Sequence, residues 1–255
     1  MKRVVDPESC RERILQDDFL YFTYSRNYLE MLKQRDTSEF KNYQWEQIKE
    51  ALQNLRLLEI GSAGGILKEF FSEVRTSDVR EGTGVDEFQD GQSLSLLDDS
   101  IDIILAKDTL HHLPDVEKHF MEVNRVLKSG GNAIYIEPNW NVVSRLVFKY
   151  LHPEDWDMRT KTWKFISNNP LDANQALARM VFIRDSQTFR RKFPELDFEI
   201  HSKPINGLSY LISGGVNQRT IIPSSILIGL AKIESASELW MKLVGFNRII
   251  TVRKK

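Results

Sequence analysis

Cysteine is almost absent from this 255-residue chain, because Cys10 is the only one. A single thiol cannot form an intrachain disulfide, and it excludes a metal cluster held by several thiolates. This agrees with a reducing compartment, so we expect a cytoplasmic protein. The chain also lacks a His-x-x-x-His pair or a convincing acidic cluster, and we therefore expect no metal.

An excess of charge of either sign is lacking as well. The chain holds 35 Lys and Arg against 36 Asp and Glu, a formal net charge of -1. Charge therefore gives no support to a nucleic-acid partner. The start of the chain turns acidic directly after Lys2 and Arg3, without the apolar core of a signal peptide. The most apolar late run, 221–230, is too short to span a bilayer.

The hydrophobic pattern changes character along the chain. Residues from about Glu8 to Asn54 are predicted to be helical and are rich in aromatic side chains. We expect these aromatics to pack on a sheet, and the alternative is a lid over a substrate cleft. From Arg56 onward, short apolar runs alternate with helical stretches, which indicates a parallel, doubly wound α/β sheet. Strands are predicted over 56–60, 74–78, 85–88, 101–106, 132–136, 197–202 and 247–253.

Helices are predicted between several of these strands, near 66–72 and over 116–127. The second is expected to stop at the glycines of 128–131. Residues 139–195 look like a cap inserted after the fifth strand. The long segment before the last strand is expected to contain helices of its own. The predicted organisation is one domain over 1–255, with N-terminal helices (1–55), a cofactor-binding half (56–138), the cap (139–195) and C-terminal strands with inserted helices (196–255).

A glycine-bearing turn follows the first predicted strand. Glu59 lies near the end of this strand, and the turn runs from Gly61 through Ser62 and Ala63 to Gly65. Such a turn lets the backbone approach a ligand closely at the start of a helix. A dinucleotide fingerprint would place glycines where Ala63 and Ile66 stand, so a nicotinamide dehydrogenase is disfavoured.

Further motifs follow in a fixed order. Asp78 ends the second strand, where an acid can bind ribose hydroxyls in doubly wound sheets. The others are Asp90-Gly91, Asp98 to Asp102, Leu110-His111-His112-Leu113-Pro114-Asp115, and Leu127 to Gly131 followed by Glu137-Pro138.

In this order the motifs resemble the class I S-adenosylmethionine-dependent methyltransferases of the ubiquinone and menaquinone type. The resemblance runs from about Leu57 to Pro138. A looser similarity over 136–145 is to methyltransferases found with bacterial surface-polysaccharide enzymes. The resemblance implies a Rossmann-like doubly wound, seven-stranded, mostly parallel sheet with N-terminal helices and a helical cap.

The resemblance also implies S-adenosylmethionine as the cofactor. Glu59 would neutralise the methionine amine directly or through water, Asp78 would bind the ribose hydroxyls, and Asp90 the adenine amine. The full set of expected cofactor residues is Glu59, Gly61, Ser62, Ala63, Gly65, Asp78, Val79, Asp90, Gly91 and Lys107.

The implied reaction is methyl transfer by in-line displacement to a small-molecule or sugar-like acceptor, at oxygen in the first instance. A hydroxyl acceptor benefits from a general base. His112 is the first candidate because it follows the fourth strand at the ligand-binding edge. Glu137 is the second and His111 the third; His152 and Asp155 in the cap are weaker candidates. The alternative is that the His pair only caps or packs the following helix.

Three departures from the family pattern stand out. Ala63 replaces the central glycine of the loop, and Lys107 stands where Ser or Asn is more common. Only six residues separate Asp78 from Val85, too few for the usual helix, so one face of the sheet is expected either to be thinner or to be covered by the N-terminal helices.

Two other functions remain open. One is a non-catalytic interaction module that keeps the nucleotide-binding fold. Ala63 and Lys107 leave this alternative open, because they depart from the family pattern. The other is a membrane-surface methyltransferase acting on a lipid-linked acceptor, with 221–233 as an interfacial helix. We favour packing of that helix on the domain or on a second subunit. The expected partners are a small-molecule acceptor and no nucleic acid, with peripheral membrane contact left open, in a monomer or homodimer.

Overall fold

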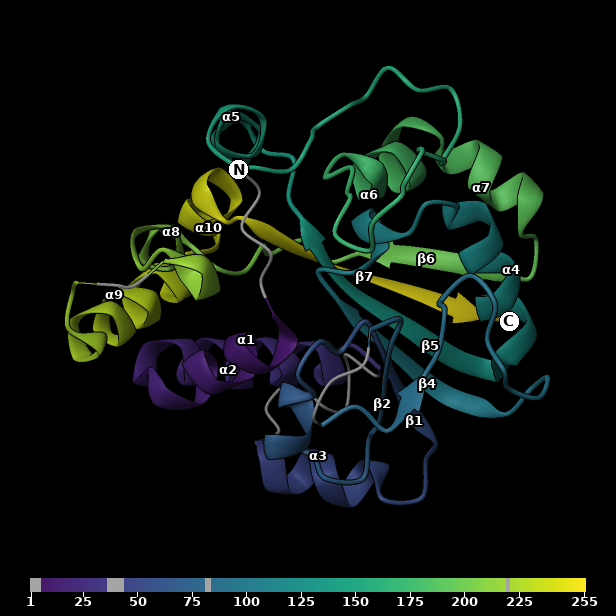
Figure 1. Ribbon diagram of the computed structural model, residues 1–255, viewed down its shortest axis with the longest axis horizontal. Coiled ribbons are helices and arrows are strands. Elements are labelled where there is room, and N and C mark those ends of the chain that lie inside the picture. Colours follow the sequence, from purple (N-terminus) through teal and green to yellow (C-terminus); the bar gives the residue numbers. More distant parts are fainter. Residues whose placement is uncertain (1–5, 36–43, 81–83, 219–220) are drawn as a thin grey trace.

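A seven-stranded sheet forms the centre of the chain in this computed structural model, which describes residues 6–35, 44–80, 84–218 and 221–255 (Figure 1). The strands are β1 (Leu57–Ile60), β2 (Arg75–Asp78), β3 (Glu87–Phe88), β4 (Ile101–Lys107), β5 (Leu127–Pro138), β6 (Leu196–Ile200) and β7 (Asn247–Lys254). Their order is β3-β2-β1-β4-β5-β7-β6. β7 runs antiparallel to both neighbours, and the pairs among the first five strands are parallel. The predicted seven-stranded, mostly parallel sheet is confirmed.

The strand order changes direction between β1 and β4. The chain moves outward from β1 through β2 to β3 and then returns to pair β4 with the other side of β1. At such a point, the loops after two adjacent strands diverge and leave a crevice at their carboxyl ends. The turns after β1 and β4 therefore frame the same opening.

Helices cover both faces of the sheet. They are α1 (Pro7–Gln16), α2 (Asp18–Lys33), α3 (Trp45–Leu52), α4 (Val116–Val126), α5 (Val142–Tyr150), α6 (Leu177–Arg179), α7 (Ser186–Lys192), α8 (Leu208–Ile212), α9 (Ser224–Ala236) and α10 (Glu238–Val244). Shorter turns are η1 (Ile66–Glu69), η2 (Leu110–His112), the π-helical η3 (Met180–Arg184) and η4 (Gly215–Asn217). One apolar core joins the sheet to α4, α6, η3 and α7. The other joins it to α1, α2, α3 and α9.

The N-terminal helices cover one face of the sheet, which was the second of the two arrangements expected there. Phe19, Tyr28 and Met31 are buried in the core beneath the β1 and β4 side of the sheet. This confirms that aromatics of this segment pack on the sheet. Residues 36–43 of the predicted helical stretch, and 81–83 after β2, lie outside the described residues.

Two local predictions were wrong. The helix expected near 66–72 is only the short 3-10 turn η1. The glycines of 128–131 do not end a helix, because α4 ends at Val126 and Leu127 is already extended at the start of β5. The β4–β5 register shifts between Ile101 and Ile103. Residues 128–131 therefore form an irregular entry to β5, with Gly130 at a φ of 78°.

The segment between β6 and β7 holds α8, η4, α9 and α10, as expected from its length. A hydrogen-bonded carboxylate joins two of these helices: Glu234 of α9 accepts from Leu208 N at 2.8 Å and from Ser209 Oγ at 2.6 Å. In the described part of the chain, none of the helices is both long and apolar enough to cross a membrane.

Phe120 gives a test of the core on the α4 side. Its side chain is fully buried and contacts three other phenylalanine rings edge-on or tilted, whereas the next residue, Met121, is exposed. Phe120→Ala should lower the free energy of unfolding by about 3–5 kcal/mol, because it leaves a cavity. Met121→Ala is the matched control and should change it by less than about 0.5 kcal/mol. Urea denaturation measures both, and equal effects would contradict this assignment of the core.

Candidate active site

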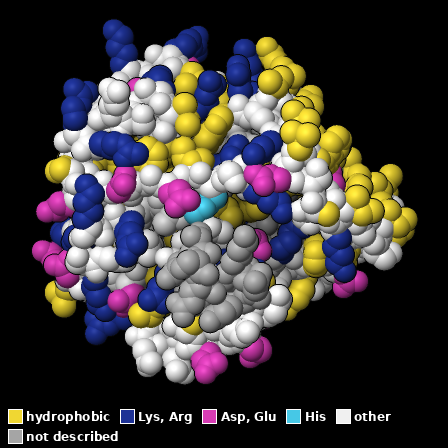
Figure 2. Space-filling view, turned by 180° about the vertical axis from the view of Figure 1, so that it is seen from behind, with side chains coloured by type: hydrophobic (Ala, Val, Ile, Leu, Met, Phe, Trp, Pro, Cys, Tyr) yellow, Lys and Arg dark blue, Asp and Glu magenta, His cyan; other side chains and the backbone are white. Residues whose placement is uncertain are grey.

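A cavity of about 1190 Å³ lies at the carboxyl ends of the central strands. Its walls come from the turns after β1 and β4, the end of β2, helices α1 and α2, the cap, and the α8 region. Seen from the back of the molecule, a histidine side chain lies beside an acidic one in a hollow near the centre of the face (Figure 2). The strand reversal therefore places one large opening where the sequence motifs meet.

The turn after β1 forms one wall of this cavity through Gly61, Ser62 and Ala63. The turn is held against β2: Ser62 N donates to Ser77 O at 3.0 Å, and Ala63 N donates to the Asp78 carboxylate at 2.9 Å. Gly61 has a φ of 67°, and a Cβ there would overlap the side chain of Thr109. Glycine is thus required at this position for both conformation and space.

Ala63 and Gly65 were both expected to face the cofactor, but only Ala63 lines the cavity. Ala63 lines the cavity with a φ of 50°, in the left-handed region where an L-residue is strained. Gly65 is not among the lining residues; it precedes η1 with a φ of 66°, and its α-carbon faces the carbonyl of Gly84. The structure therefore gives Gly65 a role in closing the turn.

Asp78, Val79, Asp90 and Gly91 also line the cavity. Asp78 is almost fully buried, and its second carboxylate oxygen accepts from Arg80 N at 2.9 Å. Asp90 accepts from Gln92 N at 2.9 Å. These acids thus hold their own loops in shape while they face the opening.

Glu59 lies behind the cavity wall and is 1% exposed. Tyr28, which does line the cavity, donates its hydroxyl to Glu59 Oε1 at 2.6 Å. The other oxygen, Oε2, is buried and has no hydrogen-bond partner among the described residues. Burial raises the pKa of Glu59 to about 7. A carboxylate oxygen without a donor is suited to receive an ammonium group or a bridging water, so it fits the methionine end of the expected cofactor.

Lys107 lines the cavity, but its side chain turns away from open space. Its ammonium group pairs with Asp108 and lies 4.4 Å from the centre of the Tyr24 ring. Burial opposes the charge, but Asp108 and Tyr210 raise the pKa of Lys107. The lysine is therefore charged and held by an acid and an aromatic face.

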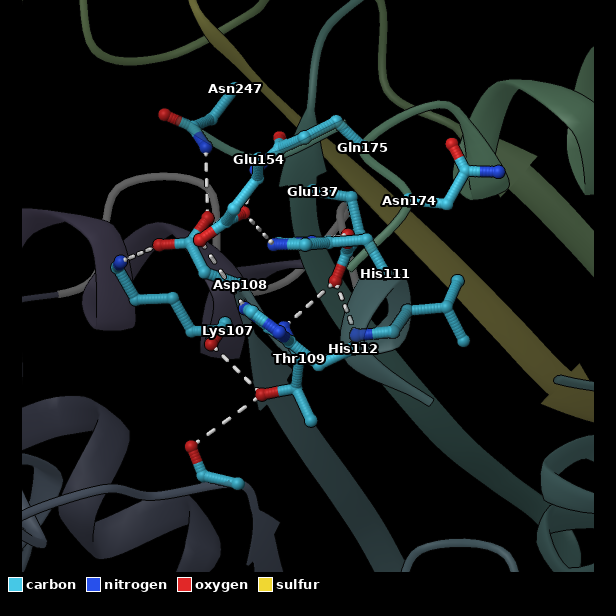
Figure 3. A network of polar contacts seen from close by, with 12 residues as sticks. Lys107, Asp108, Thr109, His111, His112, Glu137, Glu154, Asn174, Gln175 and Asn247 are labelled. Carbon is cyan, nitrogen blue, oxygen red and sulfur yellow. Dashed lines mark hydrogen bonds and ion pairs between the residues drawn. The ribbon is translucent and has the colours of Figure 1, made fainter. Parts of the chain in front are cut away.

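The turn after β4 is built around Glu137, at the end of β5. This carboxylate is fully buried and accepts from Thr109 N at 3.0 Å, from Leu110 N at 2.7 Å and from His111 Nδ1 at 2.6 Å. The Thr109 hydroxyl donates back to the Lys107 carbonyl at 3.0 Å. Figure 3 shows these contacts converging on the turn. Glu137 thus orients the turn that carries the His pair.

The two histidines have opposite electrostatic surroundings. Burial alone would lower the pKa of His111, but Glu137 and Glu154 near its two ring nitrogens raise it to about 10. Burial and the charge of His111 lower the pKa of His112 to about 4. His112 Nδ1 lies 3.1 Å from the Asp172 carbonyl, which can only accept, so Nδ1 carries the proton and Nε2 keeps its lone pair.

Glu154 and Gln175, both from the cap, complete the cluster and were missed by the sequence reasoning. Burial opposes the charge of Glu154, but His111 lowers the pKa of this carboxyl group to about 2. Gln175 donates its amide to Glu154, while its own Oε1 is buried without a partner among the described residues. The available signal in the sequence was the position of Glu154, two residues after the candidate base His152. His152 lines the cavity but Asp155 does not.

His111, His112 and Glu154 also form the one group of potential metal ligands found among the described residues. One ligand atom from each lies within 4.8 Å of the others. This group cannot be recognised from the sequence, because Glu154 lies forty-two positions after His112 in the chain.

A doubly wound sheet with a glycine turn after β1 and an acid at the end of β2 is the arrangement with which Rossmann-like proteins bind nucleotide-type cofactors. Residues 58–135 match the family model of the methyltransferase domain. The chain therefore carries a class I methyltransferase domain, with S-adenosylmethionine as the cofactor of that class. This confirms the class and the cofactor predicted from the sequence.

Solved structures share similarity with much of the chain. One is an S-adenosylmethionine-dependent methyltransferase from Archaeoglobus fulgidus, with 15% identity, 83% of this chain and 95% of the other covered, and a TM-score of 0.45. Another is the YcgJ protein from Bacillus subtilis, with 15% identity, 83% and 98% covered, and a TM-score of 0.41. A third is a phosphoethanolamine N-methyltransferase from Haemonchus contortus, with 12% identity, 79% and 48% covered, and a TM-score of 0.40. No curated protein matches the chain.

Ala63→Gly should strengthen cofactor binding and raise stability. The substitution removes a left-handed strain of about 1–2 kcal/mol, offset in part by the greater unfolded-state entropy of glycine, so a net gain below about 1 kcal/mol is expected. Ala51→Gly within α3 is the control and should destabilise by about 1 kcal/mol. Thermal unfolding and calorimetry with S-adenosylhomocysteine measure both effects. A loss of stability in Ala63→Gly would show that the methyl group is needed there.

Glu59 should make cofactor binding release a proton. An ammonium group near Glu59 lowers its pKa below about 7, so the carboxyl that is half protonated near neutral pH ionises. Calorimetry of S-adenosylhomocysteine binding in two buffers with different ionisation enthalpies measures this release. It should disappear in Glu59→Gln and persist in the control Glu117→Gln on α4. A wild-type protein that binds without proton release would rule out this contact.

Proposed function

We propose that the chain transfers a methyl group from S-adenosylmethionine to a hydroxyl oxygen of a small, sugar-like acceptor. The observation that carries this proposal is that one cavity joins the cofactor turn after β1 to the His111, His112 and Glu154 cluster. When bound, S-adenosylmethionine supplies a methyl group that its sulfonium already activates. The chain then has to hold the acceptor in line and take up its proton.

The half of the cavity beside the cap is suited to a hydroxylated acceptor. Its walls include Ser167, Asn168, Asn169 and Gln175. The unpartnered Oε1 of Gln175 is a hydrogen-bond acceptor for a hydroxyl group. The buried Gln175 oxygen favours a substrate that satisfies it, because leaving it unpaired is costly.

His112 is the general base in this proposal. Its Nε2 is unprotonated at neutral pH and faces the cluster, whereas His111 is charged and both oxygens of Glu137 already accept hydrogen bonds. We assign His111 and Glu137 to positioning, and Glu154 to stabilising the positive charge that His112 gains. The proton thus moves from the acceptor hydroxyl to His112 Nε2 as the oxygen–methyl bond forms and the sulfur–methyl bond breaks.

A non-catalytic role would leave these features unused. Ala63 and Lys107 raised that alternative, but Ala63 keeps the turn open by adopting the conformation of a glycine, and the Lys107 side chain is held by Asp108 and Tyr24. Both observations support a binding-competent cavity. Calorimetry in which S-adenosylmethionine fails to bind at high micromolar concentration would favour the non-catalytic module.

His112→Asn should lower kcat by about 10²–10⁴-fold while cofactor affinity stays unchanged, because only proton removal is lost. His201→Asn, outside the cavity, is the control. The wild-type rate should hold at neutral pH and fall as pH drops through about 4, where His112 becomes protonated. Transfer of labelled methyl groups to a panel of alkyl glycosides measures these rates.

Treatment with a chelator distinguishes a general-base role of His112 from a metal-binding role of the cluster. If His112 acts as the base, EDTA should leave the transfer rate unchanged. Loss of activity with EDTA and recovery with a divalent cation would instead show that the cluster works through a metal ion.

A further inference from the structure

Three neighbouring helices expose apolar side chains to solvent on one side of the molecule. This three-helix face consists of Val142, Leu146 and Tyr150 of α5, Ile226 and Ile233 of α9, and Leu239, Trp240 and Leu243 of α10. Viewed from the back, hydrophobic side chains gather along the right-hand edge, where these helices lie (Figure 2). A contiguous apolar surface of this kind marks an interaction site rather than an ordinary solvent face.

The opposite side of each helix is already packed on the domain. Leu227 and Ala231 of α9 join the core beneath the sheet, and Met241 of α10 is buried. The start of α5 is fixed to the end of α10, because Ser144 Oγ donates to the Gly245 carbonyl at 2.9 Å. The segment 221–233 therefore packs on the domain as favoured from the sequence, yet its outer side remains apolar.

The charges among these apolar residues are mainly positive. Arg145 and Lys149 are exposed on α5, which has no acidic residue, and Lys232 is exposed on α9. The only acid of α9, Glu234, is buried by α8, and the acid of α10, Glu238, pairs with Lys242 at 2.8 Å. Apolar side chains with surrounding cations suit an anionic lipid surface better than a second copy of the same face, because two copies would place these cations opposite each other.

The face also continues to the cavity. Leu151, 76% exposed at the end of α5, and Leu211 of α8, 39% exposed, are both lining residues. The inner side of α5 contributes Val147 and Phe148 to the same lining. One helix thus separates the open cavity from the apolar face, and an acceptor held at a bilayer surface would have a short way to the cavity.

We propose that the three-helix face docks on the surface of an anionic lipid bilayer. The apolar side chains enter the interfacial region, and Arg145, Lys149 and Lys232 meet the lipid phosphates. The docking goes beyond the methyl transfer proposed above and does not depend on it. Its test needs no methyl donor, so failure of either proposal leaves the other to be judged separately.

Vesicle co-sedimentation of the full chain tests the docking. The protein should partition onto vesicles of phosphatidylcholine mixed with phosphatidylglycerol, weakly onto phosphatidylcholine alone, and less at high salt, because salt screens the cationic contribution. The variant Leu146→Asn, Leu239→Asn and Leu243→Asn should lower partitioning at least about tenfold, since the buried apolar area is lost. Arg145→Gln with Lys149→Gln should lower it only on the anionic vesicles.

The matched control is Leu97→Asn with Met121→Asn, two exposed apolar positions outside the three-helix face. Circular dichroism confirms that each variant folds. The control should partition like the wild type. Equal loss in the control, no binding to anionic vesicles, or a stable dimer by sedimentation equilibrium that the three-leucine variant abolishes would each overturn the proposal, the last by showing that a second copy covers the face.

Discussion

The buried Glu137 carboxylate is the interaction on which the candidate site depends. It lies at the end of β5 and receives two backbone N–H groups of the turn after β4, together with the ring of His111. A buried charge is stable only when its hydrogen bonds are satisfied and an opposite charge lies close. Here, these same bonds hold the turn against the sheet, so its shape and the His111 charge depend on each other.

The different protonation states of His111 and His112 follow from that arrangement. His111 lies between two carboxylates and keeps its proton, and its charge together with burial keeps the proton off His112. Two adjacent residues of the same type are thereby separated into a charged positioning group and a neutral ring with a free nitrogen. Divergent pKa values within one pair of titratable groups are a common way to divide acid and base roles.

The N-terminal helices have two effects. They cover one face of the sheet, and they bring Tyr24 and Tyr28 to the cavity wall. Tyr28 donates to Glu59, and Tyr24 lies beside the Lys107 ammonium group. Burial of these aromatics therefore stabilises the fold and also sets the polarity of the half of the cavity expected to hold the methionine end.

The sequence by itself determined the sheet, the glycine turn, the motif order and the methyltransferase class. The sheet, the turn and the motif order arise from local periodicity and from residues that lie close together along the chain, so they can be read without knowing the packing. The methyltransferase class came from the resemblance of these motifs, in their order, to a known family. Gly65 and the glycines of 128–131 are exceptions. Their roles were assigned from typical motifs, whereas Gly65 closely approaches the carbonyl of Gly84 and residues 128–131 lie at the β4–β5 register shift.

Only the tertiary structure decided which distant side chains share the cavity. Glu154 and Gln175 join the His pair because the cap folds back over the end of the sheet. Lys107 pairs with Asp108 and lies over the ring of Tyr24, which α2 brings to the site. Likewise, hydrophobicity alone could not tell which side of α5, α9 and α10 would stay exposed. That outcome depends on which surfaces the rest of the chain covers, and contacts between segments far apart in sequence leave no local pattern.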